Sequence, residues 1–173
     1  LKSIQALEWV PHVLHKDRDS LEQAARRDGF AGFQIIQRAG DRSVRAEDRR
    51  EYFPVYYLEP FEGNENAMGF DPGQASIQRW GAIEKAIQSG AAAASHMMTL
   101  IQDKDQQHAM LVFVPIMNHE LDQAGDKEIN SLVEGVYLVE KLIAAALSDY
   151  KIPNTIVATI YEKENPAQII YSN

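Results

Sequence analysis

The sequence predicts an α+β fold in which an antiparallel sheet packs against helices. From residue 30 onward, hydrophobic and turn patterns give the order strand, strand, helix, strand, strand, strand. The chain has 173 residues, a length that suits one ordinary domain or two small domains with a shared core. Its composition is 45% hydrophobic and 24% charged, which is typical of a globular protein and not of a disordered segment.

The first thirty residues predict two helices. Apolar side chains recur at helical spacing in residues 4–10 and Pro11 ends the run, so we expect the last part of a helix there. A second helix follows, with Asp17 or Asp19 as its N-cap and Gly29 at its C-terminal end.

Two strands and a third helix are expected next. Residues 33–37 read as a strand, and residues 52–58 form a second strand of aromatic and β-branched side chains. Pro54 lies within the second strand and indicates an edge position or a bulge. Residues 77–87 carry isoleucine and tryptophan at helical spacing, and Gly90 closes that helix.

The second half of the chain predicts further strands and a further helix. Residues 96–102 and 110–116 read as two apolar strands joined by a polar hairpin loop. Residues 133–138 are a strand candidate, although residues 128–146 also fit one long helix. The remaining predicted elements are a helix at 139–147 and strands at 155–161 and 169–171.

This order of elements, with two strands before a central helix and three after it, is the plan of PAS-type sensor modules. Such modules fold as an antiparallel sheet with helices on one face. The plan therefore predicts a small-molecule pocket between the sheet and the helices.

Charge and cysteine content argue against several classes of function. The chain has 17 basic and 25 acidic residues, a net charge of −8, which disfavours nucleic acid or an anionic membrane surface as partner. The absence of cysteine excludes disulfides, thiolate metal sites and a cysteine nucleophile. Nucleotide-binding, zinc-protease and serine-hydrolase motifs are missing too, so no cofactor is expected.

The sequence also bears on the membrane. No apolar run approaches the roughly 20 residues that a membrane helix needs. The chain begins at Leu1 without an initiator methionine, so we expect an excised domain whose membrane segments lie outside it.

The histidines give a weak signal for chemistry. His12 and His15 could meet a metal ion, but they straddle the end of the first predicted helix, which favours a solvated turn, and no metal site is predicted. His96 lies on an apolar predicted strand, where a histidine is more often a core residue than a ligand or a base.

Asp71 gives the stronger signal, because it follows Met68, Gly69 and Phe70 in apolar company. An unpaired carboxylate there would cost several kcal/mol, so the side chain must be paired, hydrogen-bonded or turned toward a ligand. One interpretation is a cap on the next helix, satisfied by backbone amides near Gln74. The other is ligand contact, and one residue can do both.

A series of segments covers nearly the whole chain in a recognisable order. They are IQALEWVPHV (4–13), RDSLEQAARRDGF (18–30), REYFPVYYLEPFEGNENAMGFD (50–71), the helix ending at Ser89-Gly90, LVFVPI (111–116), VEGVYLVEKLIAAAL (133–147) and IIYSN (169–173). The series resembles the CHASE family, extracytoplasmic sensor domains of bacterial, plant and slime-mould receptors that include the plant cytokinin receptors.

The resemblance implies a stalk helix, a ligand-binding distal PAS-like subdomain and a smaller proximal PAS-like subdomain. It assigns residues 1–29 to the end of a truncated stalk helix and a connecting helix, 30–138 to the distal part and 139–173 to the proximal part. It also settles residues 133–138 as a strand. Family members have a transmembrane helix on each side and a cytoplasmic histidine kinase, diguanylate cyclase or phosphodiesterase.

The resemblance also implies contacts for the ligand. An aspartate at the position of Asp71 hydrogen-bonds the adenine ring in the cytokinin receptors, and the family's apolar contact falls near Ala94. The family's threonine contact falls near Asp103, a different residue type, which leaves adenine recognition open. The residues expected to bind ligand are Tyr57, Phe70, Asp71, Ala94, His96, Met98, Leu100 and Phe113.

The expected function is therefore a non-catalytic periplasmic or extracellular sensor domain of a cell-membrane receptor. It would bind a small molecule, act as a homodimer and reach the membrane through flanking segments. Two alternatives stay open: a small soluble enzyme that uses Asp71 or His96 as acid or base, and a structural dimerisation module without a ligand.

Overall fold

The computed structural model describes residues 4–40, 42–99, 108–121, 127–148, 159–162 and 165–172. Its helices are α1 (Arg18–Arg27), α2 (Ile77–Ser89) and α3 (Val139–Leu147), with single 3₁₀ turns η1 (His15–Asp17), η2 (Glu65–Ala67) and η3 (Pro72–Gln74). Its strands are β1 (Ile4–Pro11), β2 (Val13–Leu14), β3 (Ile36–Ala39), β4 (Arg42–Arg45), β5 (Glu51–Tyr52), β6 (Tyr57–Glu59), β7 (Ala93–Ala94), β8 (Met98–Thr99), β9 (His108–Leu121), β10 (Lys127–Leu138), β11 (Thr159–Glu162) and β12 (Asn165–Ser172).

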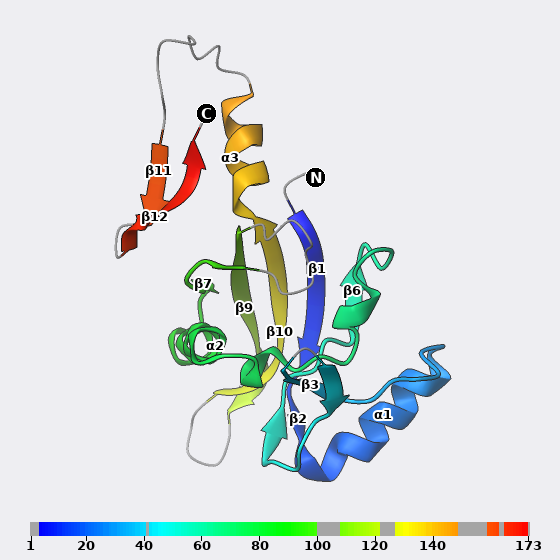
Figure 1. Ribbon diagram of the computed structural model, residues 1–173. Helices are drawn as coiled ribbons and strands as arrows, with labels where there is room; N and C mark the ends of the chain where they lie inside the picture. The colour runs from blue at the N-terminus through cyan, green and yellow to red at the C-terminus, as the bar shows by residue number, and fades with distance from the viewer. Residues whose placement is uncertain are drawn as a thin grey trace.

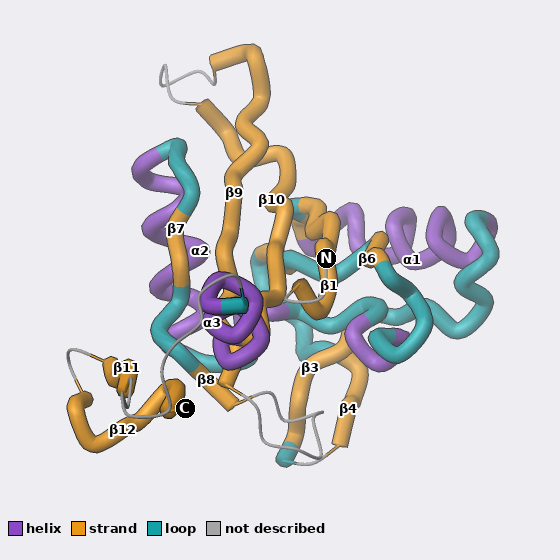
Figure 2. Tube along the Cα trace, turned by 90° about the horizontal axis from the view of Figure 1, so that it is seen from above, coloured by secondary structure: helices purple, strands orange, loops and turns teal. Residues whose placement is uncertain are grey.

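A six-stranded antiparallel sheet organises the molecule (Figure 1). The strand order is β6-β1-β10-β9-β7, and β8 pairs with the first residues of β9, His108 and Ala109. The two long strands β9 and β10 pair along most of their length, from Ala109 opposite Leu138 to Leu121 opposite Lys127. Helix α2 lies toward the β7 edge of the sheet and α1 toward the β6 edge (Figures 1 and 2). The predicted α+β class is confirmed, with the sheet antiparallel as expected.

The prediction of a helix at residues 4–10 is wrong, because this segment is strand β1, which lies between β6 and β10 in the sheet. Its inward side chains are Ala6, Glu8 and Val10, which alternate with period two as a strand requires. Glu8 occupies an inward position that normally holds an apolar residue, while Leu7 points outward and is 45% exposed. The carboxylate concealed the strand alternation, and the apolar residues that remained matched a helical spacing.

The main core lies between the sheet and α2. Helix α2 begins at Ser76, whose Oγ accepts a hydrogen bond from the Arg79 amide (3.2 Å), and it ends at Gly90 in the left-handed conformation (φ 64°). Both the predicted helix and its predicted end are thus confirmed, although Ile77 is 89% exposed. The buried residues of this core are Ala6, Val10, Phe53, Val55, Leu58, Ala82, Ile83, Ala86, Ala93, Leu111, Phe113, Leu132 and Val136.

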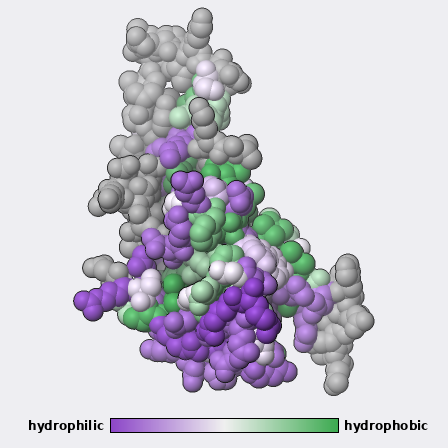
Figure 3. All heavy atoms as spheres, turned by 90° about the vertical axis from the view of Figure 1, so that its right-hand side faces the viewer, coloured by the Kyte–Doolittle hydropathy of each residue, from purple (hydrophilic) through white to green (hydrophobic). Residues whose placement is uncertain are grey.

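A second core lies beneath α1, a helix whose predicted position is confirmed. Its buried apolar residues are Val13, Ala25, Phe33, Ile35, Ala46, Tyr52 and Tyr56. Arg18 and Glu22 of α1 are also buried in it, and the Arg18 side chain donates to the Ala46 carbonyl (2.9 Å). The outer surface near α1 is polar, with a band of hydrophobic side chains above it (Figure 3).

The strands predicted around residue 52 are shorter than expected. The segment 52–58 is divided between β5 and β6, and residues 53–56 between them are buried without strand pairing. Pro54 lies within this gap, where it needs no ladder hydrogen bond, as its missing N–H predicts. The strand predicted at 33–37 begins later, as β3, and forms a hairpin with β4.

The second half of the chain follows the sequence patterns more closely. The predicted strands at 110–116 and 133–138 lie within β9 and β10, and α3 has the predicted bounds. Of the strand predicted at 96–102, only β8 is seen, and residues 100–102 lie outside the described residues. β11 and β12 form a hairpin beside α3, and the predicted residues 155–158 lie outside the described ranges (Figure 1).

Strand β10 passes into α3 without an intervening residue, since Leu138 ends the strand and Val139 begins the helix. None of the helices in the described ranges combines the length and apolar character needed to cross a bilayer. The stalk helix, the PAS-like organisation and the division at residues 29 and 138 stay predictions.

Candidate functional site

The backbone around Asp71 is held on two sides, which explains the burial of this residue. The Gly69 amide donates to the Val55 carbonyl (2.8 Å), and the Asp71 amide donates to the Ile36 carbonyl (3.0 Å). Gly69 has φ 76°, and a Cβ there would lie 2.2 Å from the Gln34 carbonyl oxygen, so only glycine fits. Residues 69–71 are thereby held between β3 and residues 53–56.

The Asp71 side chain is satisfied from within the protein. It is 1% exposed; its Oδ1 accepts from the Gly73 amide (2.9 Å), and its Oδ2 accepts from Nη1 of Arg49 (3.2 Å). Burial raises the pKa of Asp71 to about 6, although the Arg49 charge and the Gly73 and Phe53 amides act in the opposite direction. The predicted capping role is confirmed at η3, through Gly73 and not Gln74. Ligand contact by Asp71 stays a prediction.

A second buried polar group lies on the inner face of the sheet. One row crosses five strands, with Leu58 opposite Glu8, Glu8 opposite Glu134, Glu134 opposite Phe113 and Phe113 opposite Ala93. All five residues are buried. The row therefore places two carboxyl groups at the centre of an otherwise apolar surface.

Glu8 and Glu134 lie directly opposite each other with their carboxyl groups close enough to interact, and a hydrogen bond between two carboxyl groups requires a proton on one of them. Burial raises the pKa of Glu8 to about 7, against the lowering effect of the hydrogen bond to Glu134 and of the Arg79 charge. Burial and the neighbouring Glu8 charge raise the pKa of Glu134 well above its ordinary value. Among the described residues, no N–H or hydroxyl group donates a hydrogen bond to the buried Oε2 atom of Glu134.

Arg79 of α2 faces this carboxyl pair, and its charge lowers the pKa of both groups. Its Nε donates to the Met98 sulfur (3.2 Å), and its Cζ lies 5.5 Å from the centre of the Phe70 ring. Arg79 thus connects the carboxyl pair with two residues that the sequence predicted as ligand contacts.

Three of the predicted ligand contacts therefore come together around this group: Phe70 and Met98 flank Arg79, and Phe113 lies opposite Glu134 in the sheet. Among them, Phe113 is fully buried. Phe70 and Met98 thus lie on the α2 side of the main core, and Phe113 lies on the inner face of the sheet.

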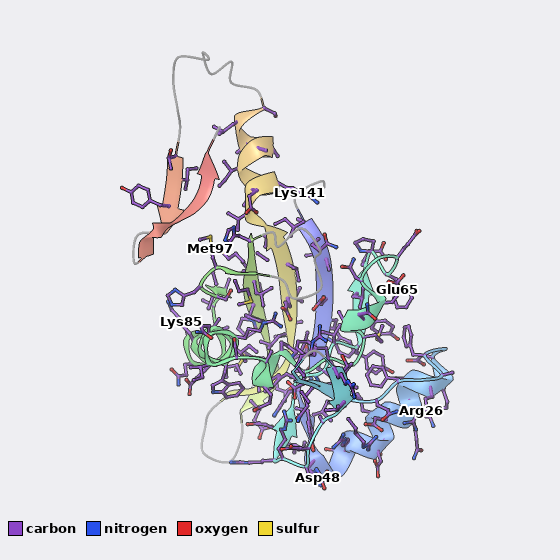
Figure 4. All side chains as sticks on the ribbon, in the orientation of Figure 1. Arg26, Asp48, Glu65, Lys85, Met97 and Lys141 are labelled. Atoms are coloured by element: carbon purple, nitrogen blue, oxygen red, sulfur yellow. The ribbon has the colours of Figure 1, made fainter. Side chains whose placement is uncertain are left out.

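The other predicted contacts lie elsewhere. Tyr57 and Ala94 belong to β6 and β7, the opposite edges of the sheet, and the Tyr57 side chain, 47% exposed, donates to Asp28 (3.1 Å). His96 lies on the exposed connection between β7 and β8, next to Met97, which Figure 4 places on the far side of the sheet from Arg26. Leu100 lies outside the described residues, as does Asp103.

The sequence reasoning missed Glu8, Arg49, Arg79 and Glu134. One signal was available: Glu134 lies in a correctly predicted strand and alternates with Leu132 and Val136, at an inward position. The pairing of Glu8 with Glu134 requires the strand register, and the pairing of Arg49 with Asp71 requires the tertiary fold.

Within the described ranges, no group of three or more histidine, cysteine, aspartate or glutamate side chains is arranged to hold a metal ion. His12 and His15, considered above as a metal pair, have separate partners. The His12 Nε2 lies 2.7 Å from Glu51 Oε2, and the His15 Nδ1 lies 3.0 Å from the Tyr52 hydroxyl.

Comparison with known proteins agrees with the resemblance. The family model of the CHASE domain matches residues 1–171. A search of curated proteins gave no match. CHASE domains are extracytoplasmic sensor domains of receptors and are not catalytic. The chain therefore belongs to the CHASE domain family.

Proposed function

We propose that this CHASE domain binds a small molecule between the inner face of its sheet and helix α2, as the sensor of a membrane receptor. The observation that carries this proposal is the position of Phe70, Met98 and Phe113. They come from three separate parts of the chain and meet around Arg79 and the two buried glutamates. Apolar walls with a few convergent polar groups are the usual composition of a small-molecule site.

The domain acts by binding and performs no reaction. A ligand shifts an equilibrium between two arrangements only by its different affinity for the two. The elements that it would contact are α2, the inner face of β10 and the segment that ends at Asp71. Asp71 keeps that segment in place through Gly73 and Arg49, and it is the first residue of the segment to test for direct contact.

Thermal-shift screening of the purified chain tests this function. The panel contains nucleobases, amino acids, amines and organic acids, each at a range of concentrations. A compound at 100 times its dissociation constant should raise the free energy of unfolding by about 2.7 kcal/mol. If no compound in the panel stabilises the chain, the domain is a ligand-free structural module and the proposal fails.

The receptor around the domain is also part of the proposal. We place the domain in the periplasm, between transmembrane helices on either side, with a cytoplasmic histidine kinase, diguanylate cyclase or phosphodiesterase as output and a homodimer as the active form. The family match supports this placement, because CHASE domains are extracytoplasmic receptor parts. Reading the full-length gene tests it: a gene without membrane segments or an output domain contradicts this architecture.

A further inference from the structure

The buried pair formed by Glu8 and Glu134 is costly for a protein that uses it only for folding. Like charges directly opposite each other in neighbouring strands are destabilising, and both side chains are removed from water. Apolar residues of similar size at a buried charged site are often neutral or stabilising by about 1–4 kcal/mol. The neighbours of the pair in its row are Leu58 and Phe113, so an apolar pair would continue that row.

The hydrogen bonds of the pair are also incomplete. One proton is shared between Glu8 and Glu134, and among the described residues no N–H or hydroxyl group donates to the buried Oε2 of Glu134. Arg79 is the nearby cation; its Nε donates to the Met98 sulfur, and among the described contacts it forms no ion pair with Glu8 or Glu134. The charged groups that face the pair are Arg79 on α2 and, next to Arg79, Arg38 on β3. Within the part of the chain that the structure describes, the shared proton is therefore the one donor available to the pair, and a ligand N–H can supply another.

We propose that Glu8 and Glu134 recognise a nitrogen cation of the ligand, a primary ammonium or an amidinium, whose N–H donates to Oε2 of Glu134. This inference rests on the proposed function and names its ligand class. With one shared proton, the pair and Arg79 together carry no net charge. When the cation binds, the shared proton leaves to solvent and the cation takes its place, so the total charge of the site is unchanged.

The surroundings specify the rest of the ligand. Phe70, Met98 and Phe113 offer aromatic and thioether surface, which suits an apolar or aromatic body attached to the nitrogen. A ligand with a carboxylate at this point would meet two carboxyl groups and be repelled. Asp71 already accepts one hydrogen bond at each of its oxygens, from Gly73 and Arg49, so the glutamate pair is the better acceptor for the cation.

Isothermal titration calorimetry with benzylamine and benzamidine tests the inference, with benzyl alcohol and benzoate as probes of similar size. At pH 8 we expect the two cations to bind at least about ten-fold more tightly than the alcohol or the acid, a difference of about 1.4 kcal/mol. Above the pKa of Glu8, where the pair holds one shared proton, binding should release that proton, so the affinity for the cations should rise about ten-fold for each pH unit; below that pKa a second proton must also leave. Titrations in two buffers of different ionisation enthalpy measure that proton directly.

Two variants locate the binding. Glu134→Gln should abolish the preference for the cations, and Glu128→Gln, which removes a charge from an exposed position of the same strand, should leave it intact. Thermal melts check that both variants fold. Equal binding of benzylamine by wild type and Glu134→Gln overturns the inference. If cations do not bind but another compound of the screening panel does, the ligand class is wrong and the sensor function stands; if nothing binds, both fail.

Discussion

Two glutamates in different regions of this domain are almost equally buried and have opposite electrostatic character. Glu22 of α1 is 2% exposed and Glu134 of β10 is 3% exposed. Burial alone would raise both pKa values, but the pKa of Glu22 is lowered and that of Glu134 is raised. The difference lies in their partners and not in their depth.

Glu22 is surrounded by donors. It accepts from the Ile35 amide (3.1 Å) and from the side chains of Arg18 (3.3 Å), Arg26 (3.1 Å) and Arg45 (2.9 Å). These hydrogen bonds outweigh burial and keep the carboxylate ionised. In the second core, beneath α1, hydrogen bonds to an ionised carboxylate therefore stabilise the fold.

Glu134 has the opposite surroundings: a second carboxyl group lies opposite it, and none of the described N–H or hydroxyl groups donates to its Oε2. A buried glutamate thus stabilises the core beneath α1 through hydrogen bonds, whereas a buried glutamate in the main core has fewer donors around it. The comparison teaches that incomplete hydrogen bonding, more than burial, separates a candidate recognition group from a structural one.

The largest expected effect comes from removing the satisfied glutamate. Glu22→Ala should lower the free energy of unfolding by about 3–5 kcal/mol, because it leaves the buried Arg18 without its buried carboxylate partner and with only the exposed Asp48 as a carboxylate. Urea denaturation at pH 7 measures this loss. Asp19→Ala is the control on the same helix, since its side chain is 83% exposed, and it should change stability by less than about 1 kcal/mol. A loss below 1 kcal/mol for Glu22→Ala would remove the contrast between the two cores.

The unsatisfied pair predicts a pH effect of the opposite sign. A raised pKa means that the folded chain binds more protons than the unfolded chain between pH 4.5 and about 7, so stability falls as pH rises through that window. The rise of the Glu8 pKa from 4.5 to about 7 corresponds to about 3 kcal/mol.

Glu134→Gln should reduce this fall and make the variant more stable than wild type at pH 8. Denaturation midpoints measured from pH 4.5 to pH 8 for both proteins test it. A Glu134→Gln variant that is less stable than wild type at pH 8 would mean that the ionised pair stabilises the fold, as Glu22 does.

Asp71 is intermediate, and the smallest effect is expected there. Its pKa is raised to about 6 even though both of its oxygens have partners. Asp71→Asn keeps an acceptor for the Gly73 amide and should change stability at pH 7 little, whereas Asp71→Ala loses the cap and about 1 kcal/mol. Thermal denaturation of the two variants side by side separates cap from charge. Equal losses in both would show that the Arg49 ion pair, and not the cap, is what stabilises this turn.

The sequence predicted those elements whose local pattern agrees with their surroundings. Helix α2 has its own cap, its apolar stripe and a glycine at its end, and α3 follows an unbroken apolar run. Strand β1 was missed because Glu8 occupies an inward position and interrupts the alternation of apolar and polar residues by which strands are recognised. A buried charged residue interrupts the apolar alternation of its strand, so it also makes that strand hard to recognise from sequence.

The site was predicted only in part, for a related reason. Phe70, Met98 and Phe113 were named as expected ligand contacts; in the structure Phe70 and Met98 flank Arg79, and Phe113 lies opposite Glu134. The carboxyl pair depends on the register between the first strand and β10, segments from opposite ends of the chain. Single-sequence patterns contain no information on such a register.

The direct passage from β10 into α3 has a mechanical consequence. With no loop at Leu138, the direction in which each side of α3 points is set by the pleat of the strand that carries Glu134. One residue inserted at this junction would turn α3 by about 100° about its own axis and advance it by about 1.5 Å, while the sheet upstream stays unchanged. The orientation of α3 about its own axis is therefore coupled directly to β10. An insertion at the junction can change that orientation without altering the buried glutamates.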